Sequence, residues 1–385
     1  MRLSWALALL LSVCLSPVLG QETSTLPPAV GQDAVVAVKA GESLYTVARA
    51  QELGLEHLAF ANGLPVSLAP LTQKNVLVPK RRILPQSPPG DGLVLNLPER
   101  GVFLFREGEY RGFFPVAIGG LGWETPVGEY QVAEKTVNPV WYPPAWAGVG
   151  HPVMPGPQNP LGDRWIGLSR RGYGIHSTDR PDSIGGAVSH GCIRTYPEHA
   201  RRLYEQVYIG MPIRIEYHPV KLGRDPETGR LEMSVFPDVY GRVNLASAAR
   251  ELLSRQGLQS LAGFETVTDL VAQKKGVVTP VFGRRVTLKR AGDQRECSGF
   301  LRQGRLYVES SALRQLGLYD TPLPAEQVLR VLEKEFVPAA TALTGTGLVP
   351  RWDGASRTLY LEGSTAPPGD SNPETPLPSA TPRSH

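Results

Sequence analysis

Cysteine and net charge are both scarce in this chain of 385 residues. Only three cysteines occur, and Cys14 falls in the extreme N-terminal segment, so a disulfide-stapled scaffold is excluded. The formal net charge is +4 and the basic residues are scattered, which is not typical of a nucleic-acid-binding protein. Neither a Gly-rich dinucleotide motif nor a P-loop is present, and metal-ligand spacings are missing. We therefore expect no cofactor, no metal and no nucleic-acid partner.

The rest of the composition is that of a folded protein. Hydrophobic residues make up 41% of the chain and charged residues 20%, close to the globular average, so wholesale disorder is excluded. Glycine (41) and proline (36) are both frequent, which favours strands, turns and linkers over helical bundles. The length is about twice what one compact domain needs, so we expect two or three folded units.

Residues 1–20 contain the longest apolar run, from Leu3 to Leu15. Pro17 and the small residue Gly20 follow it, an order typical of a secretory signal peptide. An uncleaved membrane anchor is the alternative, but the run is shorter than the ~20 residues that a spanning helix needs. Because no later segment is apolar enough to span a bilayer, we expect a secreted protein of the periplasm or cell wall, with no transmembrane span after signal cleavage.

Residues 33–80 predict a small unit with the order strand, helix, helix, strand. Ser43 can cap the first helix, Leu55 to Asn62 has a helical period, and KNVLVPK forms the closing strand. The opening from Val38 to Leu44, the residue Asn62 and the final VLVP resemble a LysM module. This resemblance implies binding to N-acetylglucosamine-containing glycan, and a spacer that binds nothing is the alternative.

The stretch RRILPQSPPGDG (81–92) is rich in proline and glycine, and we interpret it as a linker. Beyond it, residues 93–217 predict a mainly-β domain, sandwich- or barrel-like, with one or two helices. The clearest helical period runs from Glu198 to Val207. The strand candidates are Leu93–Leu97, Val102–Arg106, Phe113–Ile118, Gly128–Ala133, Trp165–Leu168 and Pro212–Glu216.

Two further units follow this domain. Residues 218–275 predict a hairpin that turns at DPETG, followed by helices. Residues 277–363 predict a small β-rich or α+β module with several hairpin turns. This module resembles the N-terminal repeats of copper amine oxidases, which carry no catalytic residues. Residues 364–385 are rich in Pro, Ser, Thr and Gly, so we expect a disordered tail.

The segment GYGIHSTDRPDSIGGAVSHGCIRTYPEHA (172–200) carries the candidate chemistry. A nucleophilic thiol needs an imidazole that takes and returns its proton, and Cys192 has His190 nearby and His176 upstream. If His176 ends a strand and the turn at Cys192 leads into a helix, the two segments can lie side by side. A lone cysteine is more often a buried apolar residue, but the flanking histidines and glycines favour catalysis.

With these residues, positions 93–216 resemble the YkuD-type L,D-transpeptidase catalytic domain. That family has a histidine followed at an interval by [ST]-H-G-C-hydrophobic-[RN], which here is His176 and SHGCIR (189–194). The strand-turn from Gly122 to Tyr130, the segment NPVWYPP (138–144) and the run GIHST (174–178) support the resemblance.

The resemblance implies an enzyme that cleaves a peptidoglycan stem tetrapeptide before its terminal D-alanine. Cys192 is then the nucleophile, which carries the acyl group as a thioester, and His176 is the general base and acid. His190 either donates to the oxyanion or takes the place of His176 as base. Gly191 is a backbone donor to the oxyanion, and a helix starting nearby lowers the thiol pKa. Ser189 orients an imidazole through its carbonyl.

Two more side chains are candidates for substrate binding. Arg194 can hold a carboxylate by a bidentate pair, although a salt bridge with Glu198 is the alternative. Tyr173 can line the pocket. Four tryptophans of the same domain can form an aromatic platform or pack in the core: Trp123, Trp141, Trp146 and Trp165.

The implied partners are peptidoglycan stem peptides and glycan. Transfer of the acyl group to an amine forms a cross-link or attaches a protein to peptidoglycan, whereas transfer to water makes the protein an L,D-carboxypeptidase. The alternative of another class is a non-catalytic peptidoglycan-binding wall protein.

Overall fold

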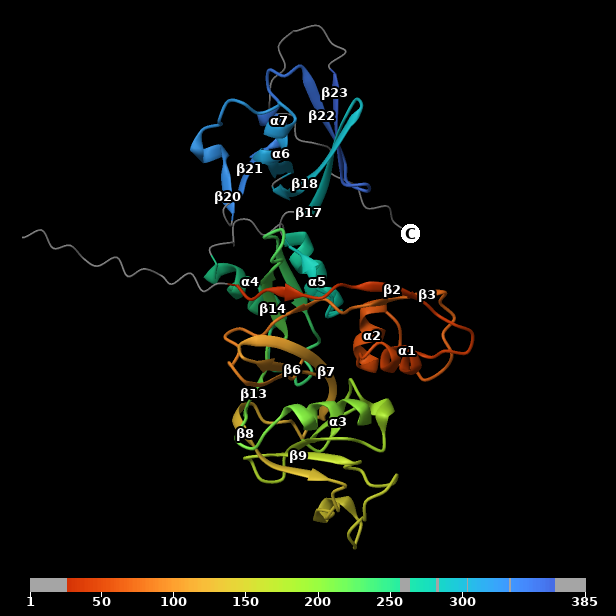
Figure 1. Ribbon diagram of the computed structural model, residues 1–385. Helices are drawn as coiled ribbons and strands as arrows, with labels where there is room; N and C mark the ends of the chain where they lie inside the picture. The colour runs from red at the N-terminus through yellow and green to blue at the C-terminus, as the bar shows by residue number, and fades with distance from the viewer. Residues whose placement is uncertain (1–25, 257–263, 282–283, 303, 332–333, 364–385) are drawn as a thin grey trace, which may run out of the picture.

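The computed structural model describes residues 26–256, 264–281, 284–302, 304–331 and 334–363, which are coloured in Figure 1. The expected signal peptide (1–20) and tail (364–385) lie outside these residues. Figure 1 shows a barrel at one end, a C-terminal unit at the other end, and a small N-terminal unit at the side of the barrel. Within the described residues, no helix is both long and apolar enough to cross a membrane.

The N-terminal unit packs two helices against a two-stranded sheet. The Ser43 hydroxyl accepts a hydrogen bond from the Thr46 N–H and so caps the first helix. The Asn62 side chain bonds to Leu58 O in its own helix and to both backbone groups of Leu77 in the last strand. The elements are β2 (Ala34–Ala37), α1 (Leu44–Ala50), α2 (Leu55–Asn62) and β3 (Asn75–Val78), with β2 and β3 antiparallel. The elements follow the order read from the sequence, whereas the LysM assignment stays a prediction.

The segment after β3 is packed where the sequence predicted a linker. It begins with β4 (Arg82–Ile83), which pairs with β1 (Ala29–Val30). Arg82 is 4% exposed, and its guanidinium lies 3.4 Å from the centre of the Phe113 ring and 3.6 Å from Glu99. Because a buried guanidinium needs such partners, the start of the 81–92 segment holds two units together rather than spacing them apart.

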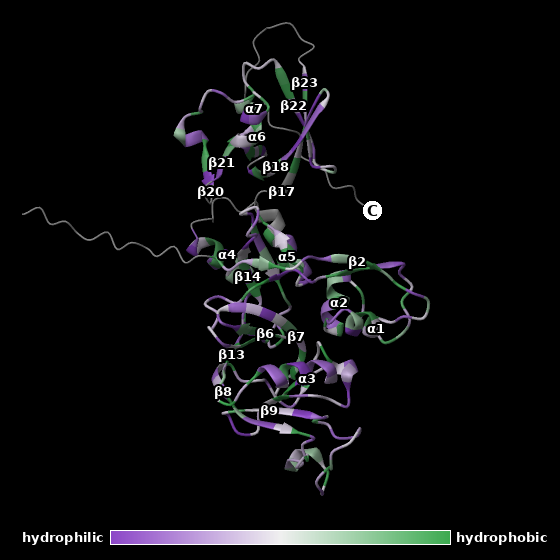
Figure 2. Ribbon diagram, viewed as in Figure 1, coloured by the Kyte–Doolittle hydropathy of each residue, from purple (hydrophilic) through white to green (hydrophobic). Residues whose placement is uncertain are grey.

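Residues 92–216 form a closed barrel. The strand order is β11-β7-β12-β10-β9-β8-β13-β5-β6, and a further pairing of β7 with β6 closes the ring. Apolar side chains such as Leu93, Leu104 and Ile213 fill the interior. Most of α3 is hydrophilic in Figure 2, while its Leu203 is buried against the barrel. The mainly-β prediction for this domain is confirmed.

The barrel elements follow the chain in order. They are β5 (Gly92–Asn96), β6 (Gly101–Arg106), β7 (Glu109–Gly119), β8 (Gly128–Val137), β9 (Arg164–Leu168), β10 (Gly174–His176), β11 (Ala187–Ser189), β12 (Ile193–Thr195), α3 (Pro197–Gln206) and β13 (Pro212–Glu216). Short 3₁₀ turns cover Ala145–Ala147 and Pro181–Ser183.

A three-stranded sheet with two helices lies between the barrel and the C-terminal unit. Its elements are β14 (Val220–Arg224), β15 (Leu231–Val235), α4 (Leu245–Arg255), α5 (Phe264–Gln273) and β16 (Thr279–Pro280). The β14–β15 hairpin turns at residues 225–230, where DPETG stands in the sequence.

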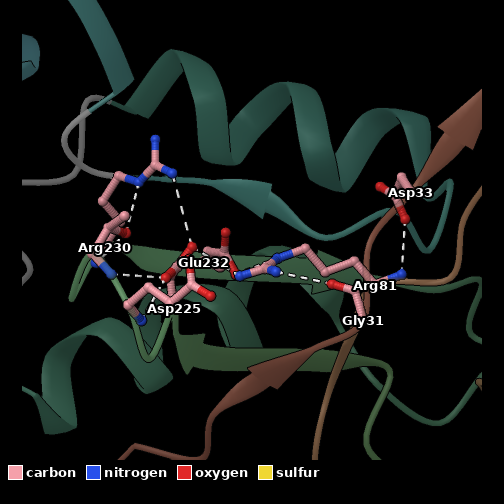
Figure 3. Close-up of polar contacts among 8 residues, drawn as sticks. Gly31, Asp33, Arg81, Asp225, Arg230 and Glu232 are labelled. Atoms are coloured by element: carbon pink, nitrogen blue, oxygen red, sulfur yellow. Dashed lines mark hydrogen bonds and ion pairs between the residues drawn. The ribbon is translucent and has the colours of Figure 1, made fainter. Parts of the chain in front are cut away.

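Arg81 connects this sheet to the N-terminal unit (Figure 3). Its Nε donates to Glu232 Oε2 and its Nη2 donates to Asp225 Oδ2, both at 2.9 Å. On the other side, Nη1 donates to Gly31 O at 3.0 Å, and the Arg81 N–H donates to Asp33 Oδ1 at 2.8 Å. A single guanidinium thus joins chain segments that are far apart in the sequence.

The C-terminal unit is a seven-stranded sheet in the order β20-β21-β19-β18-β17-β23-β22. Two of its aromatic side chains, Phe300 and Phe336, join the core of the preceding sheet. Cys297 in β18 is a free thiol, as is Cys192. The elements are β17 (Arg284–Arg290), β18 (Asp293–Arg302), β19 (Arg305–Glu309), α6 (Ser310–Gln315), β20 (Leu329–Val331), β21 (Lys334–Pro338), α7 (Ala339–Ala342), β22 (Leu348–Asp353) and β23 (Thr358–Gly363). The likeness to copper amine oxidase repeats stays a prediction.

The contacts of Arg81 predict a large loss of stability in an Arg81→Met variant. Glu232 and Asp225 are 3% and 8% exposed. Removal of Arg81 takes away the hydrogen-bonded cation of Glu232, while Asp225 keeps Arg230 at 3.8 Å, and we expect a loss of about 3 kcal/mol of unfolding free energy. Arg255→Met is the control, because its pair with Glu251 is exposed and contributes at most about 0.5 kcal/mol. Urea unfolding at pH 7 measures both. Equal losses of unfolding free energy in the two variants would contradict a stabilising role for the buried Arg81 contacts.

Candidate active site

The parallel pairing of β10 with β12 sets the geometry of the site. Ile175 lies opposite Ile193, and both are buried in the barrel core. His176 lies opposite Arg194 in the same register. Because side chains alternate along a strand, His176 and Arg194 point to the other face of the sheet, and so does Cys192, two residues before Arg194. The sequence predicted that these two segments lie side by side, and the register explains how.

His176 is buried, at 4% exposure, under the segment before β9. A Cβ on Gly162 would lie 2.5 Å from the Ser177 side chain, so a glycine is required for this close cover. His176 Nδ1 lies 2.5 Å from Ser177 O. Burial and the nearby Arg194 lower the pKa of His176 to about 3, although the carbonyls of Ser177 and Leu161 act in the opposite direction. The ring is therefore neutral at pH 7.

Cys192 lies at the end of a turn that leads into a strand. The sequence predicts a helix start here, but β12 follows Cys192 directly and α3 begins only at Pro197. The thiol donates to Gly172 O at 3.4 Å. Burial raises the pKa of the Cys192 thiol, while the Gly174 backbone and the Arg194 charge act against this rise. The expected lowering of the thiol pKa by a helix N-terminus is thus replaced by a rise.

The Ser189 side chain closes the turn that carries the thiol. Its hydroxyl donates to Cys192 O and accepts from the Gly191 N–H at 3.1 Å. Gly191 has a φ of +105°, and a Cβ on it would lie 2.8 Å from the Tyr173 ring, so only glycine fits. Two expected roles therefore change. The Gly191 N–H is engaged within the turn, and the Ser189 carbonyl accepts from Gly120 N–H rather than from an imidazole.

Thr125 and Tyr240 support this turn from behind. Thr125 Oγ1 donates to Gly191 O and accepts from Gly119 N–H, both at 2.9 Å. Tyr240, from the unit after the barrel, donates through its hydroxyl to Gly119 O and accepts from Thr125 N–H. Thr125 lies in the strand-turn that the sequence analysis singled out, but nothing in the sequence pointed to Tyr240. Its role depends on the packing of two units.

His190 projects to the surface among aromatic rings. Its ring stacks on Trp146 with the centroids 3.8 Å apart and a 12° angle between the planes, and the Trp123 ring meets it edge-on at 4.8 Å. Trp123 and Trp146 are themselves about half exposed. Trp165 instead packs beside His176. Trp123 and Trp146 thus form a surface cluster with His190, whereas Trp165 packs beside the buried ring of His176.

Arg194 and Tyr173 flank the thiol. Glu198, the expected alternative partner of Arg194, is bound instead by Arg49, with two hydrogen bonds of 2.9 Å. Among the described residues, no ion pair of Arg194 is found. Burial lowers the pKa of its guanidinium, while the charges of Asp179 and Asp182 act against this fall. Tyr173 packs against Gly191, with the Arg170 guanidinium over its ring. An unpaired, half-buried cation on the face of the nucleophile can bind an anion.

Comparison with known proteins points to one family. Residues 90–215 match the family model of the L,D-transpeptidase catalytic domain, YkuD. The chain is 31% identical over 214 residues to a protein named probable L,D-transpeptidase YbiS from Escherichia coli K12, covering 52% of this chain and 69% of that protein. It is 32% identical over 228 residues to the probable L,D-transpeptidase YcfS of the same strain, covering 54% and 71%.

Two solved structures give a partial match. An L,D-transpeptidase from Mycobacterium smegmatis aligns with 23% identity and a TM-score of 0.28, covering 32% of this chain and 57% of that one. An L,D-transpeptidase from Enterococcus faecium, solved as a C442S mutant, aligns with 21% identity and a TM-score of 0.29, covering 33% and 49%. This chain thus spans about half of each.

The raised thiol pKa predicts that Cys192 forms a free thiolate, the form that iodoacetamide alkylates, only at alkaline pH. A group whose acid form is favoured by burial ionises above its ordinary pKa, so alkylation by iodoacetamide should have a higher midpoint in the folded protein than in the unfolded protein. Peptide mass analysis across pH 6 to 11 separates Cys192 from Cys297, and urea-unfolded protein supplies the reference midpoint. A midpoint below 7 would instead indicate a preformed thiolate–imidazolium pair.

Proposed function

Because this chain belongs to the L,D-transpeptidase family, with a YkuD catalytic domain, we propose that it transfers peptidoglycan stem peptides through a thioester on Cys192. The observation that carries the proposal is the common face of Cys192, His176 and Arg194, set by the β10–β12 register. This face supplies a nucleophile, a neutral base and a cation for the substrate.

The reaction has two steps on the thiol. Cys192 Sγ attacks the carbonyl carbon of the third stem residue while His176 takes the thiol proton. The amide bond to D-alanine breaks, the leaving amine receives that proton, and the acyl group remains on sulfur. An acceptor amine then attacks the thioester, gives up a proton to His176 and forms the new amide, and the thiol is regenerated.

His176 is better suited than His190 to act as the base. A carbonyl oxygen only accepts hydrogen bonds, so the contact with Ser177 O favours the tautomer with the proton on Nδ1. Nε2 is then left unprotonated and able to accept the thiol proton. The low pKa of His176 keeps this form at neutral pH. His190 precedes Cys192 by two residues, and its ring is stacked on Trp146. We retain His190 as a candidate donor to the oxyanion.

The oxyanion needs at least one N–H donor. Since the Gly191 N–H is engaged by Ser189, we assign the Cys192 N–H as the main backbone donor. Gly191 then serves by its left-handed conformation, which turns the chain, rather than by its amide. The Ser189 hydroxyl stabilises that turn through its hydrogen bonds to Gly191 and Cys192.

The proposal also includes where the protein acts and how it binds the peptidoglycan polymer. We propose that the protein acts outside the cytoplasmic membrane, where residues 33–80 bind N-acetylglucosamine-containing glycan and the barrel receives stem peptides. The LysM-like motif and the matching order of β2, α1, α2 and β3 support the glycan role. The apolar N-terminal run in the sequence supports secretion.

The thioester predicts a covalent adduct at one position. Incubation with a stem tetrapeptide should give, by intact mass, an acyl adduct equal to the tetrapeptide without D-alanine, located on Cys192. Cys192→Ala abolishes the adduct, Cys297→Ala retains it, and His176→Gln slows its formation by about 10² to 10⁴-fold. Addition of an amine acceptor or of none separates cross-linking from hydrolysis. A wild-type protein with a free thiol and no adduct would rule out the proposal.

The unpaired Arg194 predicts selectivity for a substrate carboxylate. With a donor whose third residue carries a free side-chain carboxylate, Arg194→Met should raise KM by roughly tenfold, because a hydrogen bond to a charged group is lost. For the same donor with that carboxylate amidated, the wild type and Arg194→Met should have the same KM. Arg111→Met, at an exposed position on β7, is the control. Equal losses on both donors would show that Arg194 does not contact the carboxylate.

A further inference from the structure

The corner between α1 and α2 contacts the chain on both sides of Cys192. This corner, residues 49–56, meets Ile184 and Gly185 on the stretch that leads to the thiol. It also meets Tyr196 and Glu198 on the stretch that leads away from it. The thiol therefore lies between two stretches of chain that both contact the N-terminal unit.

The contact before the thiol is made between two backbones. The Leu55 N–H donates to Ile184 O at 2.9 Å. Gly54 lies against Gly185 so closely that a Cβ on Gly54 would be 2.7 Å from Gly185 Cα. Real Cβ atoms do not approach backbone so closely, so even one added methyl group must push Gly54 and Gly185 apart. The fit at this point thus depends on the absence of a side chain.

The contact after the thiol is polar. The Tyr196 hydroxyl, on a side chain that is fully buried, donates to Leu53 O at 3.0 Å. Arg49 binds both carboxylate oxygens of Glu198 at 2.9 Å, a bidentate pair that fixes orientation as well as distance. Glu52 accepts from Arg202 at 2.7 Å, one turn further along α3.

A short path connects these contacts to the thiol. From Gly185 the chain enters β11, which pairs with β7 and ends at Ser189. The Ser189 hydroxyl bonds both Gly191 and Cys192 across the turn. A shift of Gly185 therefore reaches Cys192 through one three-residue strand and one hydrogen-bonded side chain.

We propose that the α1–α2 corner positions the Cys192 turn, so that the N-terminal unit sets the rate of acylation even for a donor that carries no sugar. This proposal rests on the proposed function. Gly54, Arg49 and Glu198 are positioning residues, because they act on the reacting sulfur through other groups. A unit that served only to hold glycan would leave reactions with sugar-free donors unchanged.

The experiment uses the full chain and a stem tetrapeptide without sugar. Gly54→Ala should lower the acylation rate constant at saturating donor by roughly tenfold with little change in KM, since displacement of a reacting group by a fraction of an ångström costs rate. Gly90→Ala is the matched control, because a Cβ there meets nothing within 4 Å. Circular dichroism and thermal melting verify that each variant is folded.

A charge swap tests the second contact independently. Arg49→Glu should lower the rate constant by roughly threefold through repulsion from Glu198, and adding Glu198→Arg should restore it. A merely structural role would change the melting temperature without this loss and recovery of rate. If Gly54→Ala does not fold, the swap series alone decides. Folded variants that acylate at the wild-type rate would overturn the proposal.

The failure of the proposed function would be visible separately. In that case the wild type forms no adduct with the tetrapeptide, whereas Cys192 alkylation by iodoacetamide can still be compared between the wild type and the same variants. An unchanged alkylation rate in the folded Gly54→Ala and Arg49→Glu variants would then overturn the positioning role on its own.

Discussion

The register between β10 and β12 is the constraint on which the candidate site depends. Two isoleucines, Ile175 and Ile193, occupy the barrel core at the same level of the sheet. Their burial fixes which residues face the other way, and a slip of one residue would send either the imidazole or the thiol into the core. The apolar interior of the barrel thus determines the placement of the polar groups outside it.

Burial then determines the protonation states in the site. His176 is covered by the segment before β9, and Cys192 is largely removed from water, so both groups favour their neutral forms. Arg194 contributes positive charge on the same face, where Asp179 and Asp182 act on it electrostatically but form no ion pair with it among the described residues. A neutral pair beside an unpaired cation suits a reaction in which the proton moves only as the thiol attacks an anionic substrate.

The same turn receives support from two other units. Tyr240 reaches it through Thr125, and the α1–α2 corner contacts residues 184–185 before it and residues 196–198 after it. Residues 81–84 add the buried Arg82 to this arrangement. The barrel therefore packs against neighbouring units as well as being joined to them along the chain. The segment with the thiol is among those that other units contact directly.

Residue type and spacing in the sequence determined the candidate nucleophile, the histidines and the alternating strands, because these patterns are local. Tertiary structure alone decided that Ser177 rather than Ser189 presents a carbonyl to His176, that Glu198 pairs with Arg49, and that Cys192 precedes a strand. The Arg49–Glu198 pair and the β10–β12 pairing join distant segments, whereas the Ser177 carbonyl is adjacent in the sequence and meets the imidazole through the orientation of the packed ring. Hydrogen-bond partners and desolvation arise only when separate segments pack, and no local pattern records them.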